Sequence, residues 1–396
     1  MKTTIGLALA FSLAAFGFVG FAAGLDHPAP GESIAFATVV TTPLAIEGLT
    51  ADSAGNLYTT GRAGANGVSC TVWRVNPDDA HPALAVVGYL PAPSATTQCS
   101  PSGLAFDARG ALYFADGDRV LTLVPDAAAP PVATTFASGV PGTNGLTFDR
   151  DGSLWTGDGT TGLGRVWRIS PAGTVDEMFR VQPMRNGAAL GGTIAGDGVG
   201  RQARDFPPGT AANTAGAQDL VANGVEFNEE GDLLVADTAR GAIWKVSFDH
   251  DGNVRNRMGC DATFAADTLC LDSIWVAHPL LEGVDGIALD RAGNVWADAN
   301  ERNAVVVVRN SGEVAELFRN PPAATSHLRN QGPLEFPTSP VVSGHRFCTT
   351  NSDGNRRDNS PNTAGEIGGA SQPKGKISCM EQRVNVPGLP LPISSQ

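Results

Sequence analysis

The sequence predicts an all-β fold, a six-bladed β-propeller with four antiparallel strands in each blade. One observation is a segment that recurs along the chain, and the other is the composition, with 48 Gly and 27 Pro among 396 residues. Inside a helix these residues would cost roughly 1–3 kcal/mol each, so a mostly helical protein is disfavoured. Hydrophobic residues make up 42% of the chain, which provides enough apolar material for a core and argues against disorder.

The recurring segment appears five times with fixed spacing. In each copy a leading Gly is followed four residues later by Asp or Asn, then after three residues by a second Gly, and after two more by Leu or Val. The copies are EGLTADSAGNLYTTG from Glu47, SGLAFDARGALYFADG from Ser102, NGLTFDRDGSLWTGDG from Asn144, NGVEFNEEGDLLVADT from Asn223 and DGIALDRAGNVWADAN from Asp285.

Each copy predicts a β-hairpin, because apolar strand residues flank a turn that Asp and Gly favour. A third strand follows at 71–75, 119–124, 165–169, 242–246 and 304–309, and a weaker fourth strand at 83–90, 132–140, 174–181 and 314–319. Four antiparallel strands make up one blade of a β-propeller.

The sixth blade is predicted from two separate parts of the chain. Residues 335–350 look like a degraded hairpin, and residues 375–384 look like its third strand. A further strand at 33–40 precedes the first blade and has no partner there. We expect this N-terminal strand to complete the sixth blade and close the ring.

The N-terminal residues 1–24 have the features of a secretory signal peptide, with Lys2 before a long apolar run that ends in small residues. A membrane anchor is the alternative, since the run approaches spanning length, but no charged stop follows it. Residues 25–396 are then expected to form a single propeller domain with an irregular C-terminal tail. Because no second apolar stretch could span a bilayer, we expect a secreted or periplasmic protein without a membrane contact.

The six cysteines agree with export, because an even number in an exported chain suggests disulfides. Six cysteines allow 15 connectivities. We expect sequence neighbours to pair, as Cys70–Cys99, Cys260–Cys270 and Cys348–Cys379.

The residue before each leading Gly holds the same place in every blade. Equivalent positions at the start of the innermost strands converge on the axis of a propeller at one face. The candidate site residues are therefore Glu47, Ser102, Asn144, Asn223 and Asp285. Carboxylate and amide oxygens without Cys or His suit a hard divalent cation. Asn-Gly and Asp-Gly are also ordinary turn formers, but here the Asp-x-x-Gly elements supply the hairpin turns.

At these residues the chain resembles the SMP-30/gluconolactonase/LRE family, also called regucalcin-like. The most specific elements are NGVEF…GDLLVADT and DGIALDRAGNVWADAN. The resemblance implies a six-bladed propeller in which Glu47, Asn223 and Asp285 hold one divalent cation, with Ca²⁺ as the first candidate and Zn²⁺, Mn²⁺ or Mg²⁺ as alternatives. It also places Asn144 on the substrate side, and Ser102 is assigned to substrate binding by its equivalent position.

The sequence departs from that family in two places. Glu47 stands in AIEGL and not in the Glu-(Gly/Ala)-Pro context that is common there. A positive residue that is common just upstream of the substrate-side Asn is absent, and Pro141, Gly142 and Thr143 occupy the stretch. This argues against a polyhydroxylated sugar lactone as the substrate.

These features predict an exported, metal-dependent hydrolase that opens a lactone, with Asp285, or a free acid nearby, as the general base for water attack. One alternative is a non-catalytic, metal-stabilised propeller that acts as a binding module. Another is an aryl ester or phosphotriester hydrolase at the same site. The expected partner is a small lactone or ester. Nucleic acid is not expected as a partner, because a net charge of -13 is unsuited to binding it. The oligomeric state is not predicted.

Two long insertions are expected to shape the rim of this site. They span 182–222 and 255–283, and both are predicted to run from a fourth strand into the next first strand, on the face of the site. The alternative is that they are tolerated surface loops.

Overall fold

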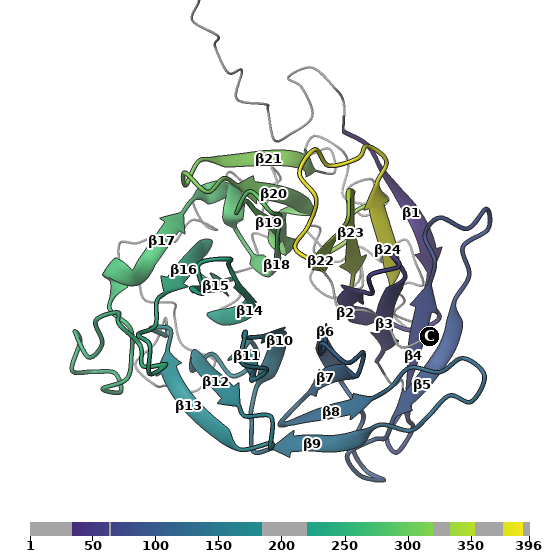
Figure 1. Ribbon diagram of the computed structural model, residues 1–396, viewed down its shortest axis with the longest axis horizontal. Helices are drawn as coiled ribbons and strands as arrows, with labels where there is room; N and C mark the ends of the chain where they lie inside the picture. The colour runs from purple at the N-terminus through teal and green to yellow at the C-terminus, as the bar shows by residue number, and fades with distance from the viewer. Residues whose placement is uncertain (1–33, 63–64, 184–219, 320–332, 353–374, 391–396) are drawn as a thin grey trace, which may run out of the picture.

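The computed structural model describes residues 34–62, 65–183, 220–319, 333–352 and 375–390. Within these ranges six four-stranded antiparallel sheets form a ring around a central axis (Figure 1). The predicted all-β, six-bladed propeller is therefore confirmed. The described part of the chain has three helical elements, all short 3₁₀ turns, at Leu271–Ser273, Pro279–Leu281 and Asn300–Arg302.

The first five blades share one plan, in which the strands follow chain order from the axis outward (Figure 1). Blade one contains β2 (Ile46–Ala51), β3 (Leu57–Gly61), β4 (Cys70–Val75) and β5 (Ala85–Leu90). Blade two contains β6 (Pro101–Phe106), β7 (Leu112–Asp116), β8 (Arg119–Leu123) and β9 (Thr134–Ser138). Blade three contains β10 (Thr143–Phe148), β11 (Leu154–Asp158), β12 (Arg165–Ile169) and β13 (Val175–Arg180). Blade four contains β14 (Ala222–Phe227), β15 (Leu233–Asp237), β16 (Ala242–Val246) and β17 (Ile274–Ala277). Blade five contains β18 (Val284–Leu289), β19 (Val295–Ala299), β20 (Ala304–Val308) and β21 (Val314–Arg319).

The sixth blade joins the two ends of the described chain, as predicted. It contains β22 (Pro337–Ser343), β23 (Arg346–Asn351) and β24 (Lys376–Met380), and β1 (Phe36–Thr41) is added as its outermost strand. Cys348 and Cys379 lie opposite each other on β23 and β24 and form a disulfide. The other two expected disulfides, Cys70–Cys99 and Cys260–Cys270, are also present. Disulfides of this kind are typical of proteins that fold in an oxidising compartment.

The leading Gly of each repeat is required by the packing of neighbouring blades. A Cβ atom at Gly48 would collide with the carbonyl oxygen of Ser102 on the next innermost strand. At Gly224 it would lie 2.5 Å from the carbonyl oxygen of Asp285, closer than any normal contact. The leading Gly of each repeat is therefore explained by the close approach of the innermost strands to one another around the axis.

The Asp-x-x-Gly elements form the hairpin turns, as predicted. In blade five, Asp290 accepts hydrogen bonds from the backbone N–H groups of Ala292 and Asn294. Its second carboxylate oxygen accepts from the indole N–H of Trp296 at 3.0 Å. The Gly at the fourth position, Gly293, has φ +76°, a conformation that side chains disfavour.

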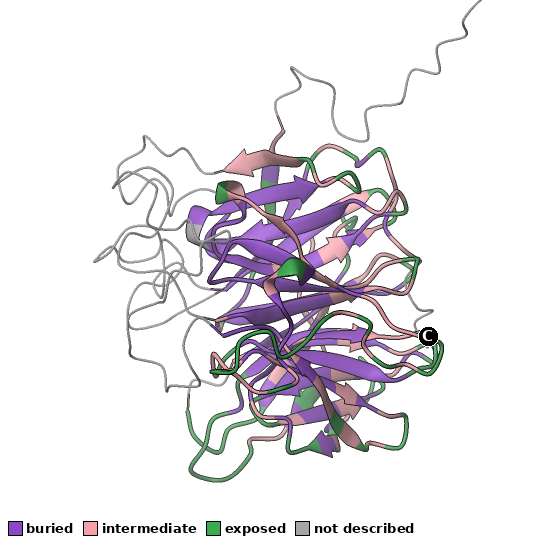
Figure 2. Cartoon of the chain, turned by 90° about the vertical axis from the view of Figure 1, so that its left-hand side faces the viewer, coloured by how far each residue is buried: buried purple, intermediate pink, exposed green. Residues whose placement is uncertain are grey.

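The core lies between the blades, where buried faces of adjacent sheets meet (Figure 2). Trp244 and Trp296 are completely buried, and the indole N–H of Trp244 donates to Asp237 at 2.9 Å. Burying a large apolar side chain contributes roughly 1.5–3 kcal/mol. Because each cluster is shared by two sheets, the blades hold one another in place and fix the innermost strands.

The interpretation of the second insertion, 255–283, was wrong. Strand β17 lies inside this range as the fourth strand of blade four, and Ala277 pairs with Ala242. The long connection therefore joins the third and fourth strands, leaving β16 at the end away from the candidate site. It runs along the outer strand of blade three, where Arg180 exchanges backbone hydrogen bonds with Asp267 and Leu269. A strand of only four residues behind a turn-rich stretch has too short a pattern to detect.

Two further predictions concern residues outside the described part. The predicted signal peptide, residues 1–24, lies outside it, as does most of the first insertion, 182–222. Among the described residues, no helix has the length and apolar character needed to cross a membrane.

Candidate active site

The five predicted site residues line a single cavity of about 300 Å³ at one end of the innermost strands. Each comes from a different blade, on β2, β6, β10, β14 and β18 in turn. Residues that are as much as 238 positions apart in the sequence, from Glu47 to Asp285, thus face one space. The residues that gather there are Glu47, Ser102, Asn144, Asn223 and Asp285.

A local irregularity of the strand aims each of these side chains at the axis. In blade one Ile46 pairs with Gly61 and Leu49 with Thr59, so that Glu47 and Gly48 together oppose one residue. The pairing register shifts at the equivalent place in the next four blades. Two residues opposite one are the pattern of a β-bulge, which bends a strand and redirects a side chain. The Gly of each repeat therefore serves both the bulge and the close approach of the next blade.

Blade six contributes Thr338 at the equivalent position. Its hydroxyl donates a hydrogen bond to the backbone carbonyl of Glu47 at 2.8 Å, and it lines the same cavity. The sequence did not reveal this residue, because Ser339 stands where the other repeats have their leading Gly. The remaining signal was the position of Thr338 at the start of the predicted hairpin.

A second residue that sequence reasoning missed is Arg62, whose guanidinium forms an ion pair with the carboxylate of Glu47. Both side chains are largely buried, at 22% exposure for Arg62 and 12% for Glu47. In blade four, by contrast, strand β15 ends in Asp237, which pairs with Arg240 at 2.8 Å. Blade one has Gly61 at the end of its second strand, so no carboxylate is available there and the Arg pairs with the acid at the axis.

The amide of Asn223 has an oxygen with no hydrogen-bond partner among the described residues. The residue is 2% exposed, and its Nδ2 donates to the hydroxyl of Thr238 at 3.0 Å. A buried acceptor without a partner costs roughly 1–3 kcal/mol. The oxygen is therefore placed to receive a cation or a hydrogen-bond donor.

Gly159 allows two amides to share the cavity. A Cβ atom at this position would collide with Nδ2 of Asn144 and would lie 2.8 Å from Oδ1 of Asn223. The missing side chain leaves this space to the two polar groups.

Asp285 is held in place by Asn300, whose Nδ2 donates to its Oδ2 at 2.8 Å. Behind it lies a second acid, Asp298, which is completely buried and accepts a hydrogen bond from Thr349 at 2.5 Å. Burial, and to a lesser degree the negative charge of Asp285, raise the pKa of Asp298 well above its usual range. The protonated form of Asp298 is thus favoured, and Asp285 is the acid of this pair that lines the cavity.

The oxygen donors fit a hard divalent cation. Two carboxylates, Glu47 and Asp285, and the unpartnered oxygen of Asn223 face one cavity, and Ca²⁺ and Mg²⁺ prefer such ligands. The ion pair with Arg62 partly neutralises Glu47, so a cation would compete with this guanidinium. Another group of side chains with metal-ligand spacing, Asp249–Asp251, lies on an exposed turn after β16 and does not line this cavity.

Comparison with known proteins confirms the family resemblance. Residues 203–328 match the family model described as the SMP-30/gluconolactonase/LRE-like region. This stretch includes Asn223 and Asp285, whereas Glu47, Ser102 and Asn144 lie before it. No curated protein sequence matches the chain.

Solved structures show the same fold at low sequence identity. A luciferin-regenerating enzyme is 12% identical with a TM-score of 0.56, covering 91% of this chain and 100% of its own. Regucalcin from Agrobacterium tumefaciens, a calcium-binding protein, is 16% identical with a TM-score of 0.55, covering 92% and 98%. A PQQ-bound aldose sugar dehydrogenase from Streptomyces coelicolor is 15% identical with a TM-score of 0.53, covering 90% and 100%. The shared propeller therefore does not determine the chemistry, which has to be argued from the site.

Proposed function

We propose that this protein is a hydrolase that opens a small lactone or ester in the cavity of the five candidate residues. The proposal rests on one observation. The carboxylate of Asp285 and the unpartnered oxygen of Asn223 face the same cavity, which is lined by hydrogen-bonding groups. The match of residues 203–328 to a family named for gluconolactonase supports the same reaction class.

Glu47, Asn223 and Asp285 would hold a divalent cation, with Ca²⁺ as the first candidate and Zn²⁺, Mn²⁺ or Mg²⁺ as alternatives. When bound, such an ion supplies Lewis acidity that polarises an ester carbonyl and stabilises negative charge on its oxygen. Asn223 contributes a neutral oxygen that its bond to Thr238 keeps in place. Arg62 limits the affinity, because Glu47 must exchange one positive partner for another.

Asp285 would act as the general base. Its carboxylate accepts a proton from a water molecule while the water oxygen bonds to the carbonyl carbon of the substrate. The carbon–oxygen bond of the ring then breaks, and the proton passes to the departing alkoxide oxygen, which gives a hydroxy acid. Asn300 keeps the carboxylate in a fixed orientation through its 2.8 Å hydrogen bond.

Asn144 and Ser102 would orient the substrate by hydrogen bonds from the wall of the same cavity. The hydroxyl of Ser102 donates to the carbonyl of Thr143 at 3.2 Å, a weak bond that a substrate oxygen can replace. Arg62 provides a positive group beside the cavity, from blade one rather than from the stretch before Asn144. A guanidinium is well suited to bind the carboxylate of the product.

The size of the cavity favours a small substrate. Its volume of about 300 Å³ is at the lower end of the range for ligand pockets. Leu220 and Phe336 add apolar surface to the polar residues already described. Together with the absence of a basic residue just before Asn144, this favours a simple aliphatic lactone over a sugar lactone.

The proposed location is the periplasm or the extracellular space. Three disulfides support an oxidising compartment, and the predicted signal peptide at 1–24 provides the export route.

A non-catalytic binding propeller is the alternative from another class. The observation that favours it is the ion pair of Arg62 with Glu47, which neutralises the acid at the axis without a cation. In that case an ion held by Asn223 and Asp285 would stabilise the fold only. An aryl ester or phosphotriester hydrolase at the same residues is the alternative within the hydrolases.

The deciding experiment measures hydrolysis of a panel of lactones, aryl esters and phosphotriesters by chelator-treated protein, with Ca²⁺, Mn²⁺, Mg²⁺ or Zn²⁺ added back. We expect turnover of a small aliphatic lactone that disappears on chelation and returns with one ion. If no substrate is turned over with any ion, although an ion raises the melting temperature, the protein is a metal-stabilised binding module.

A further inference from the structure

The propeller has a second and larger cavity, of about 490 Å³, at the other end of the same six innermost strands. None of its lining residues lines the candidate active site. The two cavities therefore have separate walls, and four of the leading glycines, Gly103, Gly145, Gly224 and Gly286, line the second cavity.

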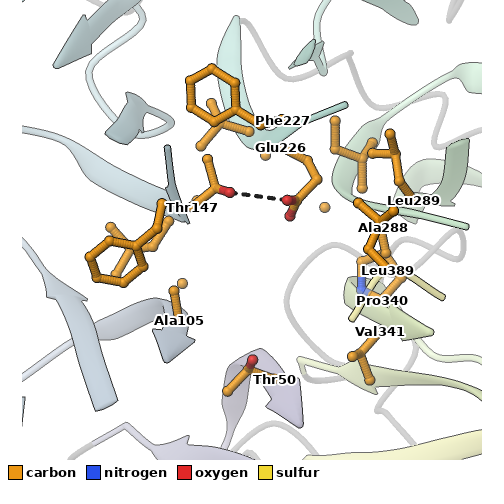
Figure 3. A pocket seen from close by; sticks show the side chains of 18 of the residues that line it. Thr50, Ala105, Thr147, Glu226, Phe227, Ala288, Leu289, Pro340, Val341 and Leu389 are labelled. Carbon is orange, nitrogen blue, oxygen red and sulfur yellow. Dashed lines mark hydrogen bonds between the residues drawn. The ribbon is translucent and has the colours of Figure 1, made fainter. Parts of the chain in front are cut away.

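A ring of equivalent positions lines this second cavity. Three residues after each candidate site residue, the side chain again faces the axis, and in most blades it is small or apolar (Figure 3). The ring consists of Thr50, Ala105, Thr147, Glu226, Ala288 and Val341. Most of the surrounding wall is apolar, with Phe106, Phe148, Phe227, Leu289 and Leu389 among its members.

Glu226 is the acid of this ring. Its carboxyl group points into the cavity and accepts a hydrogen bond from the hydroxyl of Thr147 at 3.0 Å (Figure 3). The other ionisable residues that line the cavity are Arg150 and Glu229, and Arg150 is exposed and donates to the backbone carbonyl of Glu229. Strands β2, β6, β18 and β22 contribute no ionisable residue to the lining.

The charged form of Glu226 is poorly compensated by the protein. Burial raises the pKa of Glu226 to about 7, and the hydrogen bonds from Thr147 and from the backbone of Phe227 oppose this only in part. A positively charged group within hydrogen-bond distance would offset the cost of the ionised carboxylate. The cavity thus combines an apolar wall with one carboxylate, that of Glu226, which a positively charged group would stabilise.

We propose that this second cavity binds a small molecule that has an apolar body and a single ammonium group, with the ammonium on Glu226 and Thr147. Charge-assisted hydrogen bonds to a carboxylate are stronger than neutral ones. The apolar body would lie against the phenylalanine and leucine side chains of the wall, and a negatively charged ligand would be repelled by Glu226. This proposal does not depend on the reaction at the other end of the axis.

The C-terminal segment forms part of this site. Leu389 lines the cavity, and its backbone N–H donates to the carbonyl of Leu289 at 3.3 Å. Gly388 donates in turn to the carbonyl of Gly344 at 2.9 Å. The segment is therefore attached to blades five and six at the rim, where it can contact the apolar part of a ligand.

The test uses three probes with the same apolar body, namely 2-phenylethylamine, 2-phenylethanol and phenylacetate, and measures their affinities by titration calorimetry. At pH 8 we expect the amine to bind at least tenfold more tightly than the alcohol and the acid to bind least. At pH 5.5 this preference should shrink, because Glu226 is then protonated while an aliphatic amine keeps its charge.

The variant Glu226→Gln should bind amine and alcohol with similar affinity, and the matched control Glu229→Gln at the rim should keep the wild-type preference. The pH dependence of the wild-type protein provides a test that needs no variant. Equal binding of amine and alcohol by the wild-type protein, an unchanged preference in Glu226→Gln, or no binding of any probe would overturn the proposal.

Discussion

The guanidinium of Arg62 forms an ion pair with the carboxylate of Glu47 inside the candidate active site. In blades two, three and four an Arg near the start of the third strand pairs instead with an Asp at the end of the second strand, at 2.7 or 2.8 Å. Blade one has Gly61 in place of that Asp. The acid that the family resemblance assigns to the cation thus has a positive partner within the protein.

Removing this partner should strengthen cation binding. In Arg62→Gln we expect Ca²⁺ to bind about tenfold more tightly, a change of about 1.4 kcal/mol, because Glu47 no longer has to leave a guanidinium. Titration calorimetry measures the change. Arg165→Gln is the control, since Arg165 pairs with Asp158 and does not line the cavity. An affinity that is equal in Arg62→Gln and in the wild-type protein would show that Glu47 is not a ligand.

The pKa of Glu226 predicts how stability depends on pH. Its pKa is about 7 in the folded protein, whereas the ordinary value for a glutamate side chain is 4.5. Between these values the folded state keeps a proton that the unfolded state has lost, so the free energy of unfolding falls as pH rises. The contribution is at most about 3 to 4 kcal/mol, because the two pKa values differ by about 2.5 and each pKa unit corresponds to 1.36 kcal/mol.

The variant Glu226→Gln isolates this contribution from other titrating groups. Relative to the wild-type protein, we expect the variant to gain stability on going from pH 5 to pH 8. Urea unfolding at both pH values measures the difference between the two proteins. If that difference is the same at pH 5 and pH 8, the carboxyl of Glu226 is not shifted by burial.

The fold and the candidate site were predictable because one residue type serves several constraints at once. The leading Gly stands at the β-bulge, allows the close approach of the next blade and directly follows the site residue. A short sequence pattern therefore predicted both the fold and the positions of the site residues. The second Gly, as in Gly293 with φ +76°, marks the turn. The order of the cysteines then agreed with the closure of blade six.

Other features left no such pattern. The role of Arg62 depends on how far its side chain reaches, and on the absence of an Asp at position 61. Thr338 is not followed by Gly, so the repeat did not include it. The ring that contains Glu226 was not identified from the sequence, because its residue types differ from blade to blade and only the cavity shows that this position faces the axis.

The role of the leading glycines can be tested by adding one methyl group. In Gly103→Ala the new Cβ would collide with the backbone carbonyl of Asn144, which cannot rotate away. We expect a loss of more than about 3 kcal/mol in unfolding free energy, or failure to fold, because overpacking against fixed atoms is costly. Gly231→Ala is the control: φ is +89° but the space is open, so the loss should be about 1–2 kcal/mol. Similar losses in both variants would contradict this explanation.

The disulfide between Cys348 and Cys379 should stabilise the closure of the ring. It joins adjacent strands of blade six across 31 positions, and removing such a link costs about 3–4 kcal/mol if the bond acts by restricting the unfolded chain. We expect the double variant Cys348→Ala, Cys379→Ala to melt well below the wild-type protein in calorimetry. The pair Cys260 and Cys270 encloses only 10 positions in an outer connection, so its removal should have a smaller effect. The opposite ranking would show that blade six is closed by its strand pairing alone.

The proposed role of Asp285 as the general base for hydrolysis at the axis of the propeller can be tested directly. The most direct measurement compares lactone hydrolysis by the wild-type protein and by Asp285→Asn, which keeps the shape of the side chain and its contact with Asn300 while removing the base. We expect the rate to fall at least 100-fold while the secondary structure seen by circular dichroism is retained. Hydrolysis by Asp285→Asn at a rate within threefold of that of the wild-type protein would contradict this role.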